Sequence, residues 1–198
     1  MPEKPDLAAL LGSRICHDLI SPIGAIGNGL ELLLLDGSQG GPEMALISES
    51  VANASARIRF FRIAFGQAGS DTRIARAEVQ SILADLTRGG RLSIDWKTGT
   101  DMPRAEVKIV FLLIQCLESA MAYGGKITVT DVDARWLILG QASKLKIDTG
   151  LWEVLANPTA KPDLTPAQVH FPLVAEEIMR QRRRLTTELK ETEIRLMF

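Results

Sequence analysis

Apolar residues recur every three or four positions over residues 5–35, which is the spacing of one buried face of a long α-helix. The members of this seam are Leu7, Leu11, Ile15, Leu19, Pro22, Ile26, Leu30 and Leu33. The segment 36–42 is rich in glycine and ends in proline, so it interrupts any helix. A second helix is predicted over residues 43–67, where the apolar spacing is 4-3-4-3-4. Its seam consists of Ile47, Val51, Ala54, Ile58, Phe61 and Phe65.

Two long helices joined by a short break predict a helical hairpin. One hairpin cannot cover both apolar seams, whereas two hairpins packed together form a four-helix bundle that does. We therefore expect the chain to form a homodimer through this bundle.

Beyond residue 69 the pattern changes to shorter helical and alternating stretches. Helices are predicted over residues 75–87, 104–122 and 166–180, with a short helix near Trp152. Strands are predicted over residues 91–97, 126–132, 135–141, 183–189 and 193–198. This order predicts an α+β sandwich in which helices cover mainly one face of a sheet. The sequence thus divides into a helical hairpin, residues 1–69, and an α/β domain, residues 70–198.

Composition excludes several classes of protein. The chain has 198 residues, 46% of them apolar, and a net charge of −1, so it can build a core and does not favour nucleic acid or a membrane surface. No apolar run approaches the ~18 residues of a membrane span, and the first residues do not have the layout of a signal peptide. Cys16 and Cys116, far apart in apolar surroundings, indicate neither a disulfide framework nor a zinc site. A cytoplasmic location is expected.

The segment 15–26 carries the candidate chemistry. At about 100° per residue, His17 falls on the face of the first helix opposite to the buried seam. Asp18 follows it directly and is placed to accept a hydrogen bond from Nδ1–H, which leaves Nε2 free as a nucleophile. Ser21 and Gly24 lie on nearly the same face, and their small size would let a partner helix approach His17.

Three glycines interrupt this helix at a cost of about 1 kcal/mol each relative to alanine. They are Gly24, Gly27 and Gly29. Tight helix packing and access for a partner are both possible reasons, and access has more weight for Gly24 because it shares the face of His17.

The stretch ICHDLISPIGAI resembles the H-box of sensor histidine kinases, in which an apolar or small residue precedes His, an acidic residue and Leu, and Pro follows three residues later. The residues that match are His17, Asp18, Leu19 and Pro22. The resemblance implies that His17 is phosphorylated and that the hairpin is the element for dimerisation and phosphotransfer.

The rest of the chain lacks the ATP-binding features of those kinases. Gln115 and Ser119 stand where the family has two asparagines, no Asp-x-Gly-x-Gly stretch occurs, and no glycine follows Gly150. A loop that cradles phosphate needs glycine for close backbone approach. The combination resembles the histidine phosphotransferases of the ChpT type, which pair a kinase-like hairpin with a degenerate ATPase-like domain of the Bergerat type.

This resemblance implies an ATP-independent phosphorelay protein. It would take a phosphoryl group from the receiver aspartate of a hybrid histidine kinase and pass it, through phosphohistidine, to response-regulator receivers, including a regulator of the cell cycle. No cofactor or metal would be bound by this chain, because the receiver would supply magnesium. Asp18 is expected to orient His17.

Four residues near His17 are expected to contact the partner. These are Arg14, Ser21, Gly24 and Asn28. For Arg14, a solvated side chain is an equally good interpretation. Two other functions remain open for the chain, a divergent ATP-dependent histidine kinase and a non-enzymatic dimeric scaffold or inhibitor that binds receivers or kinases.

Overall fold

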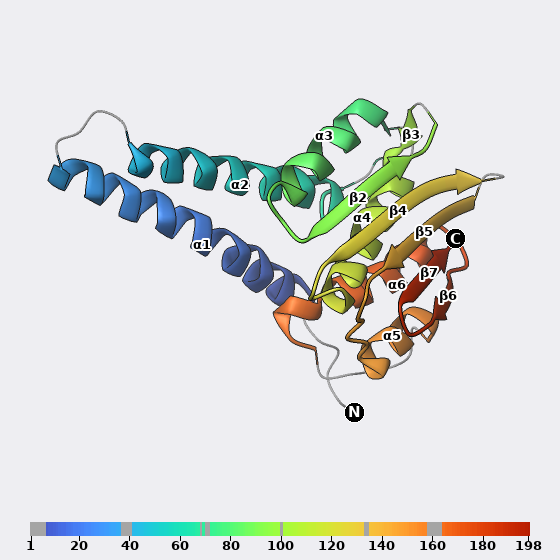
Figure 1. The fold of residues 1–198 in the computed structure, drawn as a ribbon. Helices are drawn as coiled ribbons and strands as arrows, with labels where there is room; N and C mark the ends of the chain where they lie inside the picture. Colours follow the sequence, from blue (N-terminus) through green and yellow to red (C-terminus); the bar gives the residue numbers. More distant parts are fainter. Residues whose placement is uncertain are drawn as a thin grey trace.

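The fold consists of a long helical hairpin that projects from an α/β domain (Figure 1). The computed structural model describes residues 7–36, 41–67, 69, 72–99, 101–132, 135–157 and 164–198. The hairpin comprises α1 (Leu7–Asp36) and α2 (Pro42–Ala64), which run antiparallel. No helix in the described ranges is both long and apolar enough to cross a bilayer.

The two hairpin helices pack through part of the predicted seams. Ile15, Leu19 and Ile26 of α1 are partly buried, whereas His17 is exposed, as the helical periodicity predicts. Near the far end of the hairpin the helices approach closely, because a Cβ on Gly29 would lie 2.6 Å from Cγ1 of Ile47. The packing interpretation is therefore confirmed for Gly29. A Cβ on Gly24 or Gly27 would meet nothing within 4 Å in this chain.

A stripe of apolar side chains on the hairpin lies open to solvent. On α1, Ile20 is 68% exposed and Ile23 is 59% exposed. The other members of this stripe, also exposed, are Leu30 on α1 and Met44, Val51 and Ile58 on α2. Leu30 belongs to the predicted seam of α1, and Val51 and Ile58 belong to that of α2, so one hairpin leaves both seams partly uncovered.

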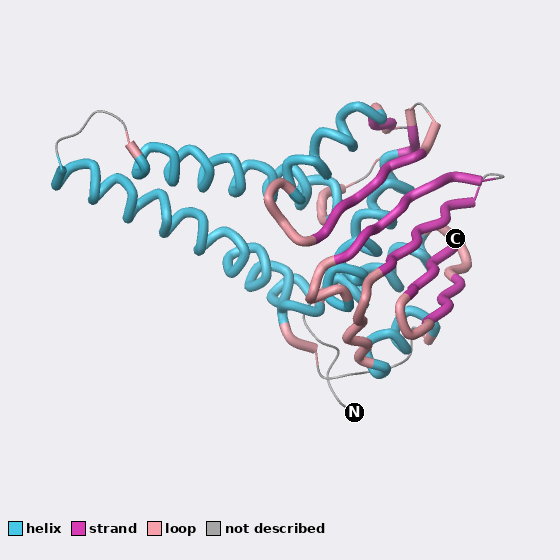
Figure 2. The backbone as a smooth tube through the Cα atoms, in the orientation of Figure 1, coloured by secondary structure: helices cyan, strands magenta, loops and turns pink. Residues whose placement is uncertain are grey.

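The α/β domain is built on a mixed five-stranded sheet in the order β2-β4-β5-β7-β6 (Figure 2). Its strands are β2 (Leu92–Lys97), β4 (Gly125–Val132), β5 (Arg135–Gln141), β6 (Thr186–Leu189) and β7 (Glu193–Met197). β2 pairs parallel with β4, and the other pairs are antiparallel. A separate two-stranded ladder joins β1 (Arg73–Ile74) to β3 (Met102–Pro103).

The helices of the domain cover one face of the sheet, which confirms the predicted α+β arrangement. They are α3 (Arg76–Thr87), α4 (Arg104–Ala120), α5 (Thr149–Ala156), the 3₁₀ helix η1 (Pro166–Gln168) and α6 (His170–Arg180). Alternation along the strands explains why the helices pack on one face. Ile127 and Val129 of β4 are buried under the helices, while Thr128 between them is only partly covered. The apolar helix α4 lies at the centre of this core.

The structure corrects several predicted boundaries. The predicted helix 166–180 begins as η1, and α6 starts only at His170, because a capping box between Thr165 and Gln168 holds a separate 3₁₀ turn. The second hairpin helix ends at Ala64 instead of residue 67, and the first of the last two strands starts at Thr186 instead of residue 183. β1 and β3 were not predicted, since two residues are too few to show a period.

Candidate functional site

His17 stands on the outer face of α1 with its side chain 86% exposed. Its Nδ1 lies 3.2 Å from Oδ1 of Asp18, the neighbour that the sequence singled out. With Nδ1 as the hydrogen-bond donor, the lone pair of Nε2 is free and faces solvent. The ring is therefore placed to act as a nucleophile toward a group carried by another protein.

Asp18 is largely covered, with only 9% of its side chain exposed, and its two oxygens have different partners. Oδ1 faces His17, whereas Oδ2 accepts a hydrogen bond of 2.7 Å from Nε of Arg14. Arg57, on α2, brings Nη1 to 3.7 Å from the same Oδ2. Two cations thus hold the carboxylate in place and leave one oxygen for the imidazole.

Arg14 does not extend into solvent. Its side chain is 18% exposed, and its Nη1 donates a hydrogen bond of 2.7 Å to the backbone oxygen of Ala167 in η1. The interpretation of Arg14 as a solvated side chain is therefore wrong. Its predicted contact with a partner stays a prediction, but the guanidinium is already engaged on both sides.

The other predicted partner contacts lie along the exposed face of α1 that carries His17. Ser21, Gly24 and Asn28 are exposed and follow His17 at a 4-3-4 spacing, so the four residues form one stripe. Beside this stripe lies a groove of about 350 Å³ that is lined by residues of α1, α2 and the end of α3. Its polar lining residues are Asp18, Ser21, Ser50, Asn53, Arg57, Asp85 and Arg88.

Two contacts of the site were not predicted. Arg57 could have been found from the hairpin itself. If one antiparallel helix ends at Asp36 and the next begins at Pro42, residue 18 lies opposite residue 60, one turn from Arg57. The carbonyl of Ala167 carries no such signal. It lies 153 residues from Arg14, and a backbone acceptor shows nothing in the residue pattern.

Two residues that the resemblance aligns with the kinase asparagines, Gln115 and Ser119, lie on α4 where this helix packs against α6. Gln115 is buried, and Ser119 Oγ donates to the Gln115 carbonyl at 3.0 Å. Because that bond uses the hydroxyl hydrogen, Ser119 accepts from Nε2 of His170 at 3.1 Å. Trp152 and Phe171 pack edge to face next to them, with ring centroids 5.6 Å apart.

His170 is buried in this region. Burial disfavours the charged imidazolium and Arg14 adds repulsion, so the pKa of His170 falls to about 3 although Asp18 opposes the shift. The ring is neutral at physiological pH. Nδ1 of His170 and Oε1 of Gln115 are buried without a hydrogen-bond partner among the described atoms.

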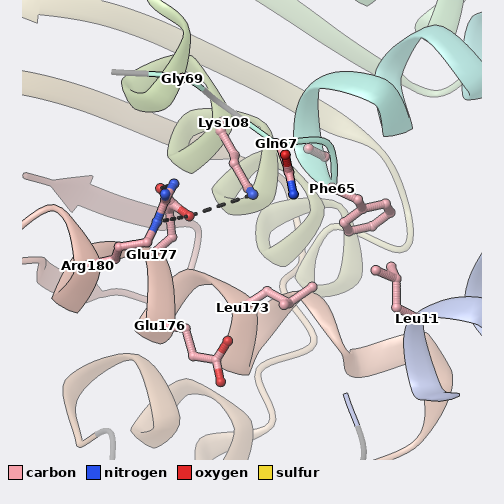
Figure 3. Close-up of a pocket in the computed structure, with 10 residues that line it drawn as sticks. Leu11, Phe65, Gln67, Gly69, Lys108, Leu173, Glu176, Glu177 and Arg180 are labelled. Atoms are coloured by element: carbon pink, nitrogen blue, oxygen red, sulfur yellow. Dashed lines mark hydrogen bonds and ion pairs between the residues drawn. The ribbon is translucent and has the colours of Figure 1, made fainter. Parts of the chain in front are cut away.

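A second groove, of about 470 Å³, lies where the base of the hairpin meets α4 and α6 (Figure 3). Lys108 points into it and donates 3.0 Å to the carbonyl of Gly66, just beyond α2. Burial raises the pKa of Glu177, but hydrogen bonds from Arg180 and Gln181 and the charge of Lys108 outweigh it and leave that pKa below its usual value. Neither His17 nor Asp18 lines this groove, so we regard it as a structural junction.

In the described ranges, no group of three or more His, Cys, Asp or Glu side chains is placed to hold a metal ion. The group at this site that can react is the His17 imidazole, and its neighbour Asp18 is contacted by Arg14 and Arg57.

Comparison with known proteins defines the class. Residues 76–193 match the family model of the histidine phosphotransferase C-terminal domain. The protein phosphotransferase ChpT of Brucella abortus (strain 2308) is 37% identical over 183 residues, which cover 87% of this chain and 86% of the relative. A solved bacterial phosphotransferase superposes with a TM-score of 0.81 at 30% identity, covering 97% of this chain and 95% of the other.

The fold and these matches define a protein phosphotransferase that works through histidine. The chain belongs to the ChpT-type histidine phosphotransferase family of phosphorelay proteins, and the resemblance seen in the sequence is confirmed.

Proposed function

We propose that His17 carries the phosphoryl group, taking it from the aspartyl phosphate of one receiver domain and giving it to another. The observation that carries this proposal is the exposed Nε2 of a ring whose Nδ1 lies 3.2 Å from Oδ1 of Asp18. A ring buried in the chain, or one whose Nε2 was hydrogen-bonded, would not reach a group held by another protein.

The chemistry balances without a further reactant. The lone pair of Nε2 forms a bond to phosphorus, and the bond from phosphorus to the receiver aspartate breaks, leaving a carboxylate. The Nδ1 proton remains on the ring, where Asp18 stabilises the positive charge that develops. The reverse step phosphorylates the next receiver. Transfer of this kind depends mostly on positioning and charge stabilisation, and we propose that the receiver contributes the magnesium ion.

We further propose that the chain does not use ATP. Gln115 and Ser119, which stand at the family's asparagine positions, are held by packing and hydrogen bonds within the core. No glycine follows Gly150, so the backbone beyond it cannot form a glycine-rich phosphate loop.

The partners we propose are the receiver of a hybrid histidine kinase as donor and response-regulator receivers, including one that controls the cell cycle, as acceptors. They would dock on the stripe of Ser21, Gly24 and Asn28 beyond His17, where small and polar side chains leave room for a helix. A cytoplasmic relay is consistent with this exchange.

We also propose a homodimer in which two hairpins form a four-helix bundle. The exposed apolar stripe, represented by Ile20 and Ile23 on α1 and Ile58 on α2, supports it, because soluble chains rarely leave such a stripe uncovered. The stripe on α1 lies next to the His17 stripe, so a bundle would bury the first and leave the second accessible.

The deciding experiment is phosphotransfer with labelled phosphate. A phosphorylated receiver is expected to label the wild-type chain, and His17→Ala is expected to lose the label while keeping the oligomeric state. Cys16→Ala, a change at the neighbouring exposed position, serves as the matched control and should retain the label.

Labelled Mg-ATP alone tests the kinase alternative, and the His17→Ala variant with two receivers tests the scaffold. Direct labelling of His17 by ATP would show a divergent kinase and reject the proposal. Unchanged passage of phosphate between receivers in His17→Ala would favour a scaffold.

A further inference from the structure

Arg14 is the one side chain of the described site that contacts both the reactive face of α1 and the C-terminal α/β domain. Nε donates to Oδ2 of Asp18 at 2.7 Å, and Nη1 donates to the carbonyl of Ala167 at 2.7 Å. Asp18 in turn faces Nδ1 of His17 at 3.2 Å. A continuous chain of hydrogen bonds therefore runs from η1 to the imidazole.

The acceptor at the far end of this chain is fixed by its own turn. Gln168 N donates to the Thr165 carbonyl at 3.0 Å, and Thr165 N donates to Oε1 of Gln168 at 3.0 Å. A carbonyl at the end of such a short helix has no partner within the helix and needs one from outside. Arg14 supplies that donor, as basic side chains often do at helix ends.

We infer that Arg14 is a positioning residue that lets the C-terminal domain set the tautomer and orientation of His17. This inference rests on the proposed function and deepens it. Asp18 can hold the Nδ1–H tautomer only while Oδ1 stays directed at the ring. Arg14 enforces this by occupying Oδ2 from a guanidinium that is itself anchored on η1.

Arginine suits this task better than lysine. Its guanidinium is planar and rigid, so the Nε and Nη1 donors keep a fixed relation to each other, and one cannot turn without the other. A lysine ammonium at position 14 would keep the positive charge but not the paired geometry. Arg57 does not duplicate the role, because its Nη1 is 3.7 Å from Oδ2 of Asp18, beyond hydrogen-bonding distance.

The consequence is a second role for the α/β domain. If the domain holds η1 against α1, it sets the tautomer and orientation of the His17 ring through Arg14 and Asp18, although it supplies no reacting group. The coupling predicts that loosening η1 or removing the arginine slows transfer without affecting the ability of a receiver to dock.

The test compares Arg14→Gln, Arg14→Lys and the matched control Arg59→Gln in the full chain. Arg59 also joins the hairpin to the domain, since its Nη1 is 2.8 Å from Oδ2 of Asp85 on α3, but it is not among the cations that contact Asp18. Ring ¹⁵N shifts of labelled histidine report the tautomer at a pH where the rings are neutral. The chain has two histidines, and buried His170 serves as the internal reference.

We expect Arg14→Gln to lower the fraction of the Nδ1–H tautomer of His17 and to slow transfer from a phosphorylated receiver by about tenfold to a hundredfold. Receiver affinity should change less than twofold. Arg59→Gln should leave the tautomer and the rate within about twofold of wild type. In an Asp18→Asn background, Arg14→Gln should have little further effect, because both changes break the same chain of contacts.

Three results would overturn the inference. These are a wild-type tautomer and rate in Arg14→Gln, the same loss in Arg59→Gln, or full additivity with Asp18→Asn. If Arg14→Gln fails to fold, Arg14→Lys decides by the same measurements, and wild-type behaviour there rejects the need for a planar donor pair. A wild-type chain that no receiver labels would instead reject the proposed function, while the tautomer measurement would still test the role of Arg14.

Discussion

His17 and Asp18 are adjacent in the chain, yet their side chains have opposite environments, one 86% exposed and the other 9% exposed. The pair joins an accessible nucleophile to a carboxylate held by Arg14 within the protein, at a distance of 3.2 Å between Nδ1 and Oδ1. An exposed ring can meet its partner, and we propose that the covered carboxylate holds the ring in one tautomer and orientation between encounters.

Replacing the carboxylate should therefore slow the chemistry more than it weakens the fold. Asp18→Asn removes the charge that favours the Nδ1–H tautomer, and we expect the rate of transfer from a phosphorylated receiver to fall by about 10²-fold or more. Rapid-quench measurement of phosphohistidine formation checks this. The control is Asp85→Asn, which removes a carboxylate of the same groove that pairs with Arg59 and Arg88 and is not a partner of His17. An equal loss of rate in both variants would contradict the role of Asp18.

The exposed apolar stripe makes a prediction about assembly. Ile23→Glu places a charge in the proposed bundle interface, and we expect it to weaken self-association at least tenfold, as measured by sedimentation equilibrium. Val132→Glu is the matched control, since Val132 is 54% exposed but lies on the α/β domain. If Ile23→Glu self-associates at the same protein concentrations as the wild-type chain, this stripe is not the interface.

The periodicity of apolar residues was enough to predict most elements of the fold. The seams of α1 and α2 and the alternation in β4 and β5 are dominated by local sequence, and their elements were predicted to within a few residues. The elements that were missed or given wrong bounds are short, or their ends depend on interactions that the periodicity does not show. Two-residue strands show no period, and η1 separates from α6 through a capping interaction between Thr165 and Gln168.

The site was predictable only in part, for a related reason. The position of His17 and its relation to Asp18 follow from the helical wheel and from adjacency in the chain. The orientation of Arg14 does not, because the same position on α1 would be equally favourable for a solvated side chain. Its acceptor, the carbonyl of Ala167, becomes a neighbour only when the α/β domain has folded against the hairpin.

The glycines of α1 offer a separation of stability from function. Gly27→Ala and Gly24→Ala should each raise the free energy of unfolding by up to about 1 kcal/mol, because helix propensity improves and the new Cβ meets nothing within 4 Å. Gly29→Ala should lose that gain, since its Cβ would lie 2.6 Å from Cγ1 of Ile47. Urea denaturation measures all three.

Function should then distinguish Gly24 from Gly27. If Gly24 gives a receiver access to His17, Gly24→Ala slows transfer at a fixed receiver concentration although the protein is more stable. Gly27→Ala, off the His17 stripe, serves as the control for docking. Equal transfer rates in Gly24→Ala and wild type would show that a receiver does not need the space at this position.

His170 gives a prediction about acid sensitivity. In the folded chain its pKa is about 3, whereas an unfolded chain has the ordinary value of 6.5, so the unfolded state takes up the proton first as pH falls. Titration of His170 therefore leaves the free energy of unfolding unchanged above about pH 6.5 and lowers it as the pH falls from 6.5 to about 3. One proton sets a maximum slope of about 1.4 kcal/mol per pH unit.

His170→Gln removes this titration and keeps an amide donor for Ser119. We expect the variant to be less stable than wild type at pH 7.5, because the buried packing against Phe171 is lost, but to lose less stability between pH 6.5 and pH 4.5. Urea denaturation at a series of pH values measures both slopes, with Gly27→Ala as a variant that should keep the wild-type slope. Glu177 also contributes below its ordinary pKa of 4.5, so the comparison stops at pH 4.5. Parallel slopes for wild type and His170→Gln would mean that His170 is protonated in the folded chain.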